Sequence, residues 1–391
     1  MRILHLGKYY APHAGGIENF VADLAREQVR GGDEVMVLAH GDRPFAPPLT
    51  EVIHGVLVRR VRTFGTLVHT PLSPGFGWEL ARALRSFRPD VVHAHVPNVS
   101  AFWMLLARKS IPLVLHWHSD VVPSAHDAGL RRLYAPYAVF ERMLLERADA
   151  VIATSAPYMQ TSAALRRVRG KCRVVPLGVA PERVEFSLRE RDGAGRGRVP
   201  MVLAVGRFAY YKGFEHLVHA MRGLEDARLV IAGDGPMRGR VEALVDALEL
   251  GCRVSLPGRV SDEELRRHWS EATVFCLPSI ERTEAFGVAM VEAMAYGLPV
   301  VSTDIPGSGV GFVNHHGVTG LVVPPGDASA LADAIGTLLD DAAGREAMGR
   351  AARKRFDEFF HIGPVRESVS DVYGELLGHV AMPLRQTAEA R

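Results

Sequence analysis

Cysteine is scarce in this chain of 391 residues, which holds only Cys172, Cys252 and Cys276. Their wide spacing argues against a disulfide framework and a structural zinc site, and it suits a reducing cytoplasm. Long apolar runs are also missing, since the longest, such as Ala101–Ala107, are far too short for a membrane-spanning helix. Because Met1–Leu4 opens directly on an expected strand, we expect a cytoplasmic protein without a signal peptide.

Nothing in the composition points to nucleic acid, because no basic cluster is interleaved with aromatic residues. Hydrophobic residues make up 48% of the chain and charged residues 23%, which is typical of a folded protein, and the length favours two domains. The net charge of +2 hides an asymmetry. Residues 1–190 hold 24 Lys and Arg against 17 Asp and Glu, a net +7, whereas residues 191–391 hold 22 against 27, a net −5. The basic half could face an anionic membrane or acidic substrates.

Short apolar runs alternate with helical patterns along the whole chain. Expected strands in the first half are residues 3–6, 34–38, 91–95, 112–116 and 150–154; those in the second half are 201–205, 228–232, 253–256, 274–277, 299–302 and 320–323. Expected helices include residues 17–29, 214–222, 237–248, 263–269, 328–339, 344–356 and 364–377. Continuous apolar strands separated by helices predict parallel sheets covered on both faces, an α/β fold of two doubly wound domains.

The charged, glycine-rich segment 187–198 has no periodicity and is the expected linker. We therefore place an N-terminal domain at residues 1–186 and a C-terminal domain at 199–363. Residues 364–391 form a helix and tail that could cross back to the N-terminal domain.

The stretch from Thr283 to Val300 carries two carboxylates, Glu284 and Glu292, around the start of an apolar helix. Gly297 follows in the position of a C-terminal glycine cap, and Pro299 forbids continuation of the helix. A strand, an acidic loop and then a helix form the arrangement that binds a ligand at a helix N-terminus above a parallel sheet.

Four other stretches also follow expected strands. They are Gly15-Gly16 before the first helix, Gly206–Gly213 with Arg207 and Lys212, Gly233–Pro236, and His116–Asp120. Two fixed cations at a strand end suit a diphosphate, and lysine is otherwise rare in this arginine-rich chain. The Gly206–Gly213 spacing matches neither a nucleoside triphosphatase loop nor a dinucleotide fingerprint. Each stretch alone could be an ordinary turn, and His116 with His118 could be structural histidines.

Together these stretches resemble the retaining family 4 glycosyltransferases of the GT-B fold. The resemblance covers nearly the whole chain, and its most specific part is Glu284 and Glu292, with seven residues between them, beside Arg207 and Lys212. It implies two Rossmann-like domains that face each other across a cleft, with the C-terminal helix packing back on the first. Three further stretches are similar to bacterial mannosyl- and rhamnosyltransferases of cell-surface glycan assembly: residues 118–120, 171–179 and 307–310.

The resemblance also implies roles for single residues. Arg207, Lys212, Glu284 and His118 are the expected catalytic residues: the cations stabilise a nucleoside diphosphate leaving group, and Glu284 and His118 contact the donor sugar. Glu292 would hold the ribose hydroxyls. The remaining donor-binding residues are expected to be Gly15, Gly16, Gly233, Val260, Ala285, Phe286, Gly287 and Val288, and the acceptor side is expected to include Tyr9, His13 and Asp120.

We therefore expect a metal-independent hexosyltransferase that needs no cofactor and takes a nucleotide-sugar donor, GDP-mannose being favoured. The chain contains no Asp-x-Asp, and the cation cluster removes the need for a divalent metal. Its acceptor would be a saccharide or a lipid-linked molecule. The alternatives are a UDP-sugar-dependent transferase, an epimerase or hydrolase on the same fold, or a silent binding protein. Peripheral contact with an anionic membrane is a further expectation, based on Arg131, Arg132, Arg142 and Arg147 beside an apolar stripe of Leu130, Leu133, Tyr134 and Tyr137.

Overall fold

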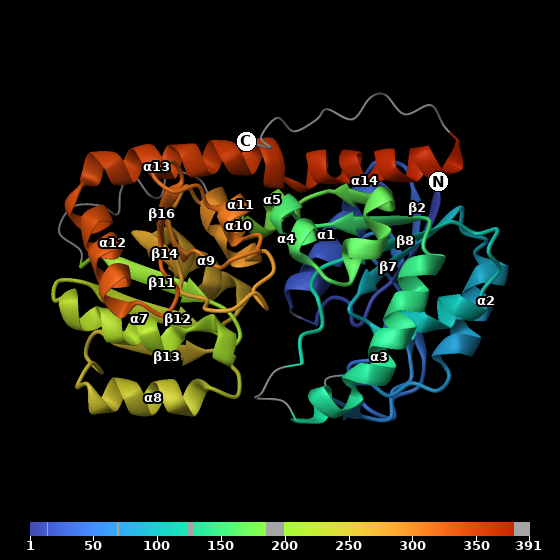
Figure 1. The fold of residues 1–391 in the computed structure, drawn as a ribbon, viewed down its shortest axis with the longest axis horizontal. Helices are drawn as coiled ribbons and strands as arrows, with labels where there is room; N and C mark the ends of the chain where they lie inside the picture. Colours follow the sequence, from blue (N-terminus) through green and yellow to red (C-terminus); the bar gives the residue numbers. More distant parts are fainter. Residues whose placement is uncertain (14, 69, 124–127, 185–198, 379–391) are drawn as a thin grey trace. The chain divides into compact units, whose positions relative to one another are not determined.

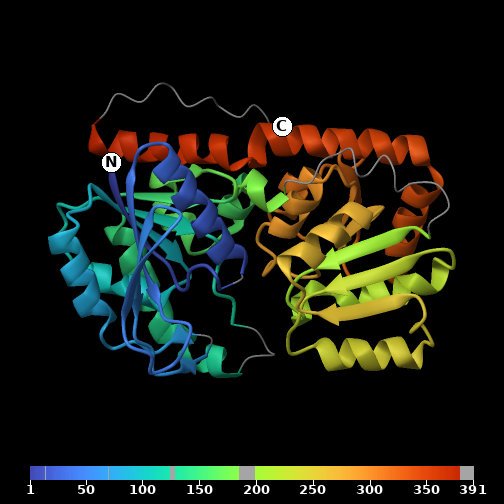
Figure 2. The same cartoon turned by 180° about the vertical axis from the view of Figure 1, so that it is seen from behind.

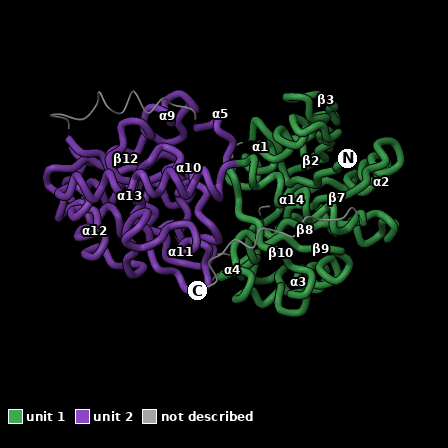
Figure 3. Tube along the Cα trace, turned by 90° about the horizontal axis from the view of Figure 1, so that it is seen from above, with its two compact units in different colours: residues 1–178, 362–391 green, residues 179–361 purple. Residues whose placement is uncertain are grey.

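The structure, a computed structural model, describes residues 1–13, 15–68, 70–123, 128–184 and 199–378. The chain divides into two units (Figure 3): unit 1 comprises residues 1–178 and 362–391, and unit 2 comprises residues 179–361. The division after Gly178 comes earlier than the boundary expected at residue 186. Val179 pairs with His361 and donates its N–H to the carbonyl of Phe360, which places residues 179–184 in unit 2. The expected linker, residues 187–198, lies outside the described residues.

Unit 2 is built on a six-stranded parallel sheet (Figures 1 and 2). Its strands are β11 (Met201–Val205), β12 (Arg228–Ala232), β13 (Val254–Gly258), β14 (Val274–Leu277), β15 (Val300–Thr303) and β16 (Gly320–Val323). They lie in the order β13-β12-β11-β14-β15-β16. The first three strands of the chain therefore run from β11 to the β13 edge of the sheet. The next strand, β14, lies on the other side of β11, and β15 and β16 follow it to the opposite edge. This reversal is the topological switch point, where open α/β sheets bind their ligands.

The helices of unit 2 confirm the periodicity seen in the sequence. They include α7 (Phe214–Ala220), α8 (Arg238–Ala247), α9 (Asp262–Glu271), α10 (Val288–Ala295), α12 (Ala328–Asp340) and α13 (Ala342–Arg355). The side chains of Leu217, Ile231 and Leu331 belong to one buried cluster between helices and sheet. Gly297 adopts a left-handed φ of 64° just after α10, which is the expected glycine cap.

Unit 1 contains an eight-stranded sheet in the order β10-β9-β8-β7-β1-β2-β4-β3. The strands are β1 (Arg2–Leu6), β2 (Glu34–His40), β3 (Leu49–Ile53), β4 (Val56–Val61), β7 (Val91–Val96), β8 (Leu113–Trp117), β9 (Ala150–Ala153) and β10 (Cys172–Val174). The expectation of a wholly parallel sheet was wrong at one edge, because β3 pairs with β4 in the antiparallel direction. One face of β3 stays largely exposed, so its sequence lacks the continuous apolar run of the parallel strands.

The helical elements of unit 1 include one that comes from the far end of the chain. They include α1 (Gly16–Arg30), α2 (Phe76–Ser86), the 3-10 segment η1 (Val99–Leu106), α3 (Ala128–Arg147) and α14 (Ile362–Leu377). The last of them, α14, packs against α1, with Tyr373 fully buried and Arg173 paired to Glu375 at 2.8 Å. The expected return of the C-terminal helix to the N-terminal domain is therefore confirmed. None of the described helices combines the length and apolarity needed to span a membrane.

Candidate active site

Lys212 and Glu284 connect the two loops at the switch point of unit 2. Lys212 lies on the loop after β11 and Glu284 on the loop after β14, and the ammonium nitrogen is 2.6 Å from one carboxylate oxygen. The same oxygen accepts a hydrogen bond of 2.7 Å from the Ser279 hydroxyl. Both charged side chains are largely buried. A buried ion pair with an additional hydrogen bond is a fixed pair, because breaking it would leave an uncompensated charge.

The pKa of Lys212 reports this fixed charge. Burial alone would lower the pKa of the ammonium, but the Glu284 carboxylate, with help from Tyr211, outweighs it and the pKa is raised. Arg207 on the same loop acts in the opposite direction, because its positive charge repels the ammonium group of Lys212. Arg207 itself is exposed. The loop therefore carries a fixed buried cation and an exposed one.

Glycines let the neighbouring loops approach each other beside this pair. Gly206 has a φ of 156° and Gly233 a φ of 139°. A Cβ on Gly233 would lie only 2.0 Å from the carbonyl oxygen of Gly206, so no other residue fits there. Gly233 thus serves the packing of the β11 and β12 loops, and Val260 is half-buried on the loop after β13.

The N-terminus of α10 lies directly after Glu284. Ala285 and Phe286 are buried, and Gly287 adopts a left-handed φ of 85° before the helix begins at Val288. The first turn of α10 carries no acidic side chain. The opening N–H groups of a helix have no intrahelical partners, so this terminus can bind an anion.

Glu292, one turn into α10, has a partner that sequence reasoning missed. Its carboxylate accepts a hydrogen bond of 2.6 Å from a guanidinium nitrogen of Arg183. Arg183 belongs to the short helix α5 (Pro181–Val184), 109 residues earlier in the chain. No local motif could have revealed a pair at that separation. The expected site residues Arg207, Lys212, Gly233, Val260 and 284–292 thus all belong to unit 2.

The other expected site residues belong to unit 1. Tyr9 and His13 stack with ring centroids 4.2 Å apart, and His13 lies 3.2 Å from Asp42. Asp120 accepts hydrogen bonds from the indole of Trp117 at 2.8 Å and from Ser162 at 2.7 Å. Asp120 therefore helps to hold its own loop.

Gly15 and Gly16 precede and begin α1, as the sequence predicted. Glu18 sits in the first turn of this helix, and a Cβ on Gly15 would meet its carboxylate at 2.2 Å. A carboxylate at this position opposes an anion, so α1 is a weaker anion site than α10. His118 is buried, and its Nε2 atom lies 3.0 Å from Nδ1 of His95.

Comparisons with known proteins show which family the chain belongs to. A family model described as glycosyl transferases group 1 matches residues 189–355, and one described as Glycosyltransferase Family 4 matches residues 14–183. The D-rhamnosyltransferase WbpZ of Pseudomonas aeruginosa is 32% identical over 92% of each chain. A GDP-mannose-dependent alpha-mannosyltransferase of Mycobacterium tuberculosis is 31% identical over 100% of this chain and 99% of its own.

Among solved structures, sucrose-phosphate synthase from Thermosynechococcus elongatus superimposes with a TM-score of 0.82 at 27% identity, over 97% of this chain and 100% of that one. The two family models together cover both units, and the relatives align over nearly their full lengths. The chain therefore belongs to the group 1 and family 4 glycosyltransferases, and it is a glycosyltransferase with the GT-B fold.

Proposed function

We propose that this glycosyltransferase moves a hexose, with mannose from GDP-mannose favoured, to a saccharide or lipid-linked acceptor in cell-envelope glycan assembly. The observation that carries the proposal is the Lys212–Glu284 pair beside the N-terminus of α10, at the switch point of the unit 2 sheet. The favoured donor is supported by the relative named for GDP-mannose dependence, and transfer of a hexose-type sugar by the relative named as a D-rhamnosyltransferase.

The diphosphate of the donor binds where positive charge is already fixed. Lys212 stays protonated because Glu284 raises its pKa, and Arg207 adds a second cation on the same loop. The N–H groups at Val288 complete the site. Charge that develops on the leaving diphosphate is stabilised without rearrangement, which is how preorganised cations lower a barrier. Catalysis without a divalent metal is consistent with this set of cations and N–H groups.

The carboxylates hold hydroxyl groups at the two ends of the donor. Glu284 uses the oxygen that Lys212 and Ser279 leave free to accept from a sugar hydroxyl. Glu292 accepts from the ribose hydroxyls while Arg183 holds it in place. Val260 contacts the base, and the Gly233 loop allows the nucleotide to approach the backbone.

The chemical step is front-face substitution with retention. The acceptor hydroxyl oxygen forms a bond to the anomeric carbon on the face from which the diphosphate oxygen leaves, and a phosphate oxygen of the departing group takes the hydroxyl proton. His118 contacts the sugar, whereas Tyr9, His13 and Asp120 belong to the acceptor side. No protein nucleophile takes part, so the residues act by positioning and electrostatics.

A donor panel tests the proposal. The purified protein is incubated with GDP-mannose, a GDP-deoxyhexose and UDP-glucose, and release of nucleoside diphosphate is measured with and without saccharide or polyprenyl-linked acceptors. We expect acceptor-dependent release that is greatest with GDP-mannose. Preference for UDP-glucose would identify the alternative donor class, and conversion without any acceptor would identify an epimerase or hydrolase. Failure to turn over any sugar nucleotide, with folding intact, would refute the proposal.

We also propose that unit 1 contacts an anionic membrane surface, where a lipid-linked acceptor would reside. The apolar stripe expected on α3 is not fully exposed, because Leu130, Tyr134 and Tyr137 are half-buried. Exposed apolar side chains instead extend across α2, η1 and α3, of which both α2 and α3 contact η1. We call this surface the apolar face; it comprises Trp78, Trp103, Leu106, Leu133, Val139, Phe140 and Met143.

Basic residues lie on the same elements as the apolar face. Exposed members on the same three elements or directly after η1 are Arg82, Arg85, Arg108, Lys109, Arg131, Arg132 and Arg142. Arg82 also lies over the ring of Trp78, 5.7 Å from its centroid. Aromatic and aliphatic side chains among cations form the combination that binds reversibly to anionic lipid headgroups.

A further inference from the structure

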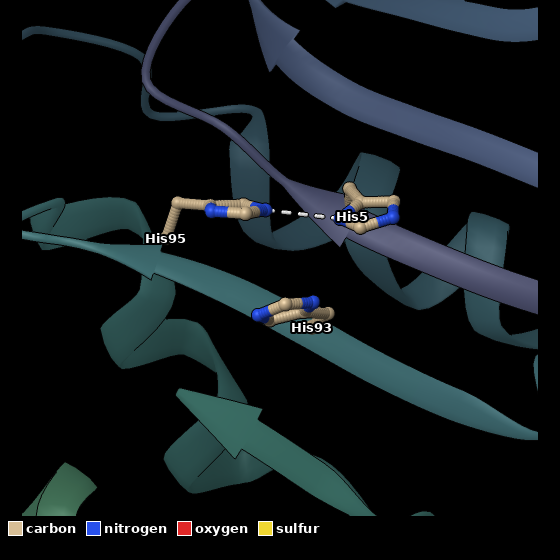
Figure 4. A group of neighbouring side chains, drawn as sticks. All are labelled: His5, His93 and His95. Carbon is tan, nitrogen blue, oxygen red and sulfur yellow. Dashed lines mark hydrogen bonds between the residues drawn. The ribbon is translucent and has the colours of Figure 1, made fainter. Parts of the chain in front are cut away.

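Five histidines lie side by side in the interior of unit 1. His5 is on β1, His93 and His95 are on β7, and His116 and His118 are on and just after β8. All five are at most 4% exposed. The strand register brings them together, because His5 pairs with His93 (Figure 4) and His95 pairs with His116. Buried imidazole nitrogens are usually satisfied by hydrogen bonds or by a shared ligand.

Hydrogen bonds connect three of these rings in series. Nδ1 of His5 lies 2.9 Å from Nε2 of His95, and Nδ1 of His95 lies 3.0 Å from Nε2 of His118. Figure 4 shows the first of these bonds, with the rings of His5 and His95 turned toward each other. At the other end, Nε2 of His5 lies 2.7 Å from the amide oxygen of Gln28 on α1, and the Gln28 amide nitrogen lies 3.3 Å from the hydroxyl of Tyr373.

Every ring in this series is neutral near pH 7. Burial lowers the pKa of His5 to about 4 despite its hydrogen bond to Gln28, and it lowers the pKa of His118 to about 3. The pKa of His95 is also held well below its usual range, mainly by burial and to a smaller extent by repulsion from the neighbouring imidazoles. A neutral imidazole carries one proton, so one of its nitrogens donates and the other accepts.

Gln28 then fixes the position of each proton. Its amide oxygen can only accept, so His5 carries its proton on Nε2 and its Nδ1 is an acceptor. His95 must therefore donate from Nε2 and accept at Nδ1. His118 in turn donates from Nε2, which leaves a bare lone pair on Nδ1. Within the described residues this Nδ1 atom is buried and has no hydrogen-bond partner.

We infer that the series Gln28–His5–His95–His118 sets the tautomer of His118, so that His118 presents Nδ1 as a hydrogen-bond acceptor to a sugar hydroxyl. His95, His5 and Gln28 are thus positioning residues that act through His118. The inference rests on the proposed function for the role of the hydroxyl, but not for the position of the proton. Tyr373 extends the series to α14: its oxygen accepts from Gln28, and its own hydrogen is directed to Nδ1 of His93, 2.6 Å away.

A metal ion shared by the same histidines is the competing explanation. Two triads place one ring nitrogen of each member within 4.8 Å of the others: His5 with His93 and His95, and His95 with His116 and His118. Five of the six ring pairs within these triads, however, are stacked, and only His5 and His93 are tilted, by 38°. The ring centroids of His116 and His118 lie 4.4 Å apart with planes inclined by only 10°. A ligating imidazole points its lone pair at the ion within the ring plane, so nearly parallel stacked rings cannot converge on one ion. The facing nitrogens of His5, His95 and His118 already pair with one another.

Nitrogen NMR of the full chain labelled with 15N-histidine tests the proton positions directly. Long-range proton–nitrogen correlations at pH 7.5 distinguish a protonated ring nitrogen from a bare one, and signals are assigned by the loss of one histidine at a time. We expect His118 to be protonated on Nε2 and bare on Nδ1. A proton on Nδ1 of His118 would overturn the inference. This result does not depend on any activity, so failure of the proposed function would leave it standing.

Matched variants test the positioning role. His95→Phe breaks the series, whereas His116→Phe makes the same change at a stacked neighbour whose two ring nitrogens have no partner within the described residues. We expect His95→Phe to give a mixture of His118 tautomers and to lower kcat/KM with GDP-mannose about threefold to tenfold, the effect of one neutral hydrogen bond. His116→Phe should keep the wild-type tautomer and rate. Equal effects of the two variants would show a merely structural role and overturn the inference.

Gln28 supplies a second pair of variants should His95→Phe fail to fold. Gln28→Leu removes the acceptor that orients His5, and Gln28→Glu restores an acceptor at that place. We expect Gln28→Leu to give a mixture of His118 tautomers and Gln28→Glu to give the wild-type tautomer. Chelator-treated protein titrated with Zn²⁺ tests the competing explanation. Stoichiometric binding that His95→Phe abolishes would overturn the series in favour of a metal site.

Discussion

The ammonium nitrogen of Lys212 lies 2.6 Å from the carboxylate of Glu284, and this pair joins the loops after β11 and β14. We predict that Glu284→Ala lowers kcat about 100-fold or more, as removal of a preorganised electrostatic contact does. It should also lower the free energy of unfolding by about 3–5 kcal/mol, because Lys212 is left buried without its partner. Steady-state kinetics and urea unfolding measure the two effects. Glu281→Gln, a carboxyl change on the same loop, serves as the control; a loss of kcat equal to that of Glu284→Ala would contradict the assignment.

Within unit 2, a guanidinium nitrogen of Arg183 lies 2.6 Å from a carboxylate oxygen of Glu292. If Arg183 holds Glu292 for the ribose, Arg183→Ala should raise KM for the sugar nucleotide about tenfold with a smaller change in kcat, since a hydrogen bond to a charged group is worth about 1.5–3 kcal/mol. Initial rates over a range of donor concentrations separate the two parameters. Arg166→Ala, the same charge change at an exposed position of unit 1, should leave KM as in the wild type. A fall in kcat at constant KM would instead place Arg183 in the chemical step.

Buried neutral histidines predict that unit 1 loses stability in mild acid. The pKa of His5 and of His40 is lowered to about 4 in the folded chain, against 6.5 for exposed histidine, so the unfolded chain binds more protons below pH 6.5. Stability is therefore complete above pH 6.5 and falls as the pH drops toward 4. Each such histidine costs about 1.4 kcal/mol at pH 5.5.

Urea unfolding at pH 7.5, 6.5 and 5.5 measures this loss, followed by tryptophan fluorescence, to which Trp78, Trp103 and Trp117 of unit 1 and Trp269 of unit 2 contribute. His40→Asn should reduce the proton uptake on unfolding by about one proton at pH 5.5, because His40 is one of the histidines whose pKa is lowered in the folded chain. A free energy of unfolding that is flat between pH 7.5 and 5.5 would show that these histidines are protonated in the folded state.

Part of the site could be predicted from sequence because it is local. Glu284, Gly287 and Glu292 follow one strand within fifteen residues, and Lys212 follows another, so the parallel sheet was enough to bring them to one edge. Arg183 and the histidine series could not be found this way. His5 and His95 are 90 residues apart, and only the register of β1 against β7 makes them neighbours. The antiparallel β3 was missed for a different reason, since an exposed edge strand lacks the continuous apolar run of buried ones.

We expect substitution by alanine to have opposite effects on the free energy of unfolding at Gly233 and at Gly239. Gly233→Ala puts a Cβ 2.0 Å from the carbonyl oxygen of Gly206 at a φ of 139°, so we expect a loss of about 3 kcal/mol in the free energy of unfolding and weaker donor binding. Gly239 lies within α8 with open space around its Cβ position, and Gly239→Ala should stabilise by about 0.5–1 kcal/mol. Thermal and urea unfolding measure both. Destabilisation by Gly239→Ala would show that the loss at Gly233 is not specific to its contact.

The apolar face of unit 1 predicts lipid-dependent binding. Co-sedimentation with phosphatidylglycerol vesicles should exceed that with phosphatidylcholine and should fall with salt, because each surface cation contributes about 1 kcal/mol near an anionic membrane. Charge reversal at Arg131 and Arg132 should weaken binding more than tenfold, and Leu106→Ala, which removes a side chain that is 79% exposed, should weaken it without affecting folding. Reversal of two exposed arginines of unit 2, Arg222 and Arg267, is the matched control. If that control weakens binding as much, the attraction reflects total charge alone; if neither anionic lipid nor Leu106 matters, the face does not contact a membrane.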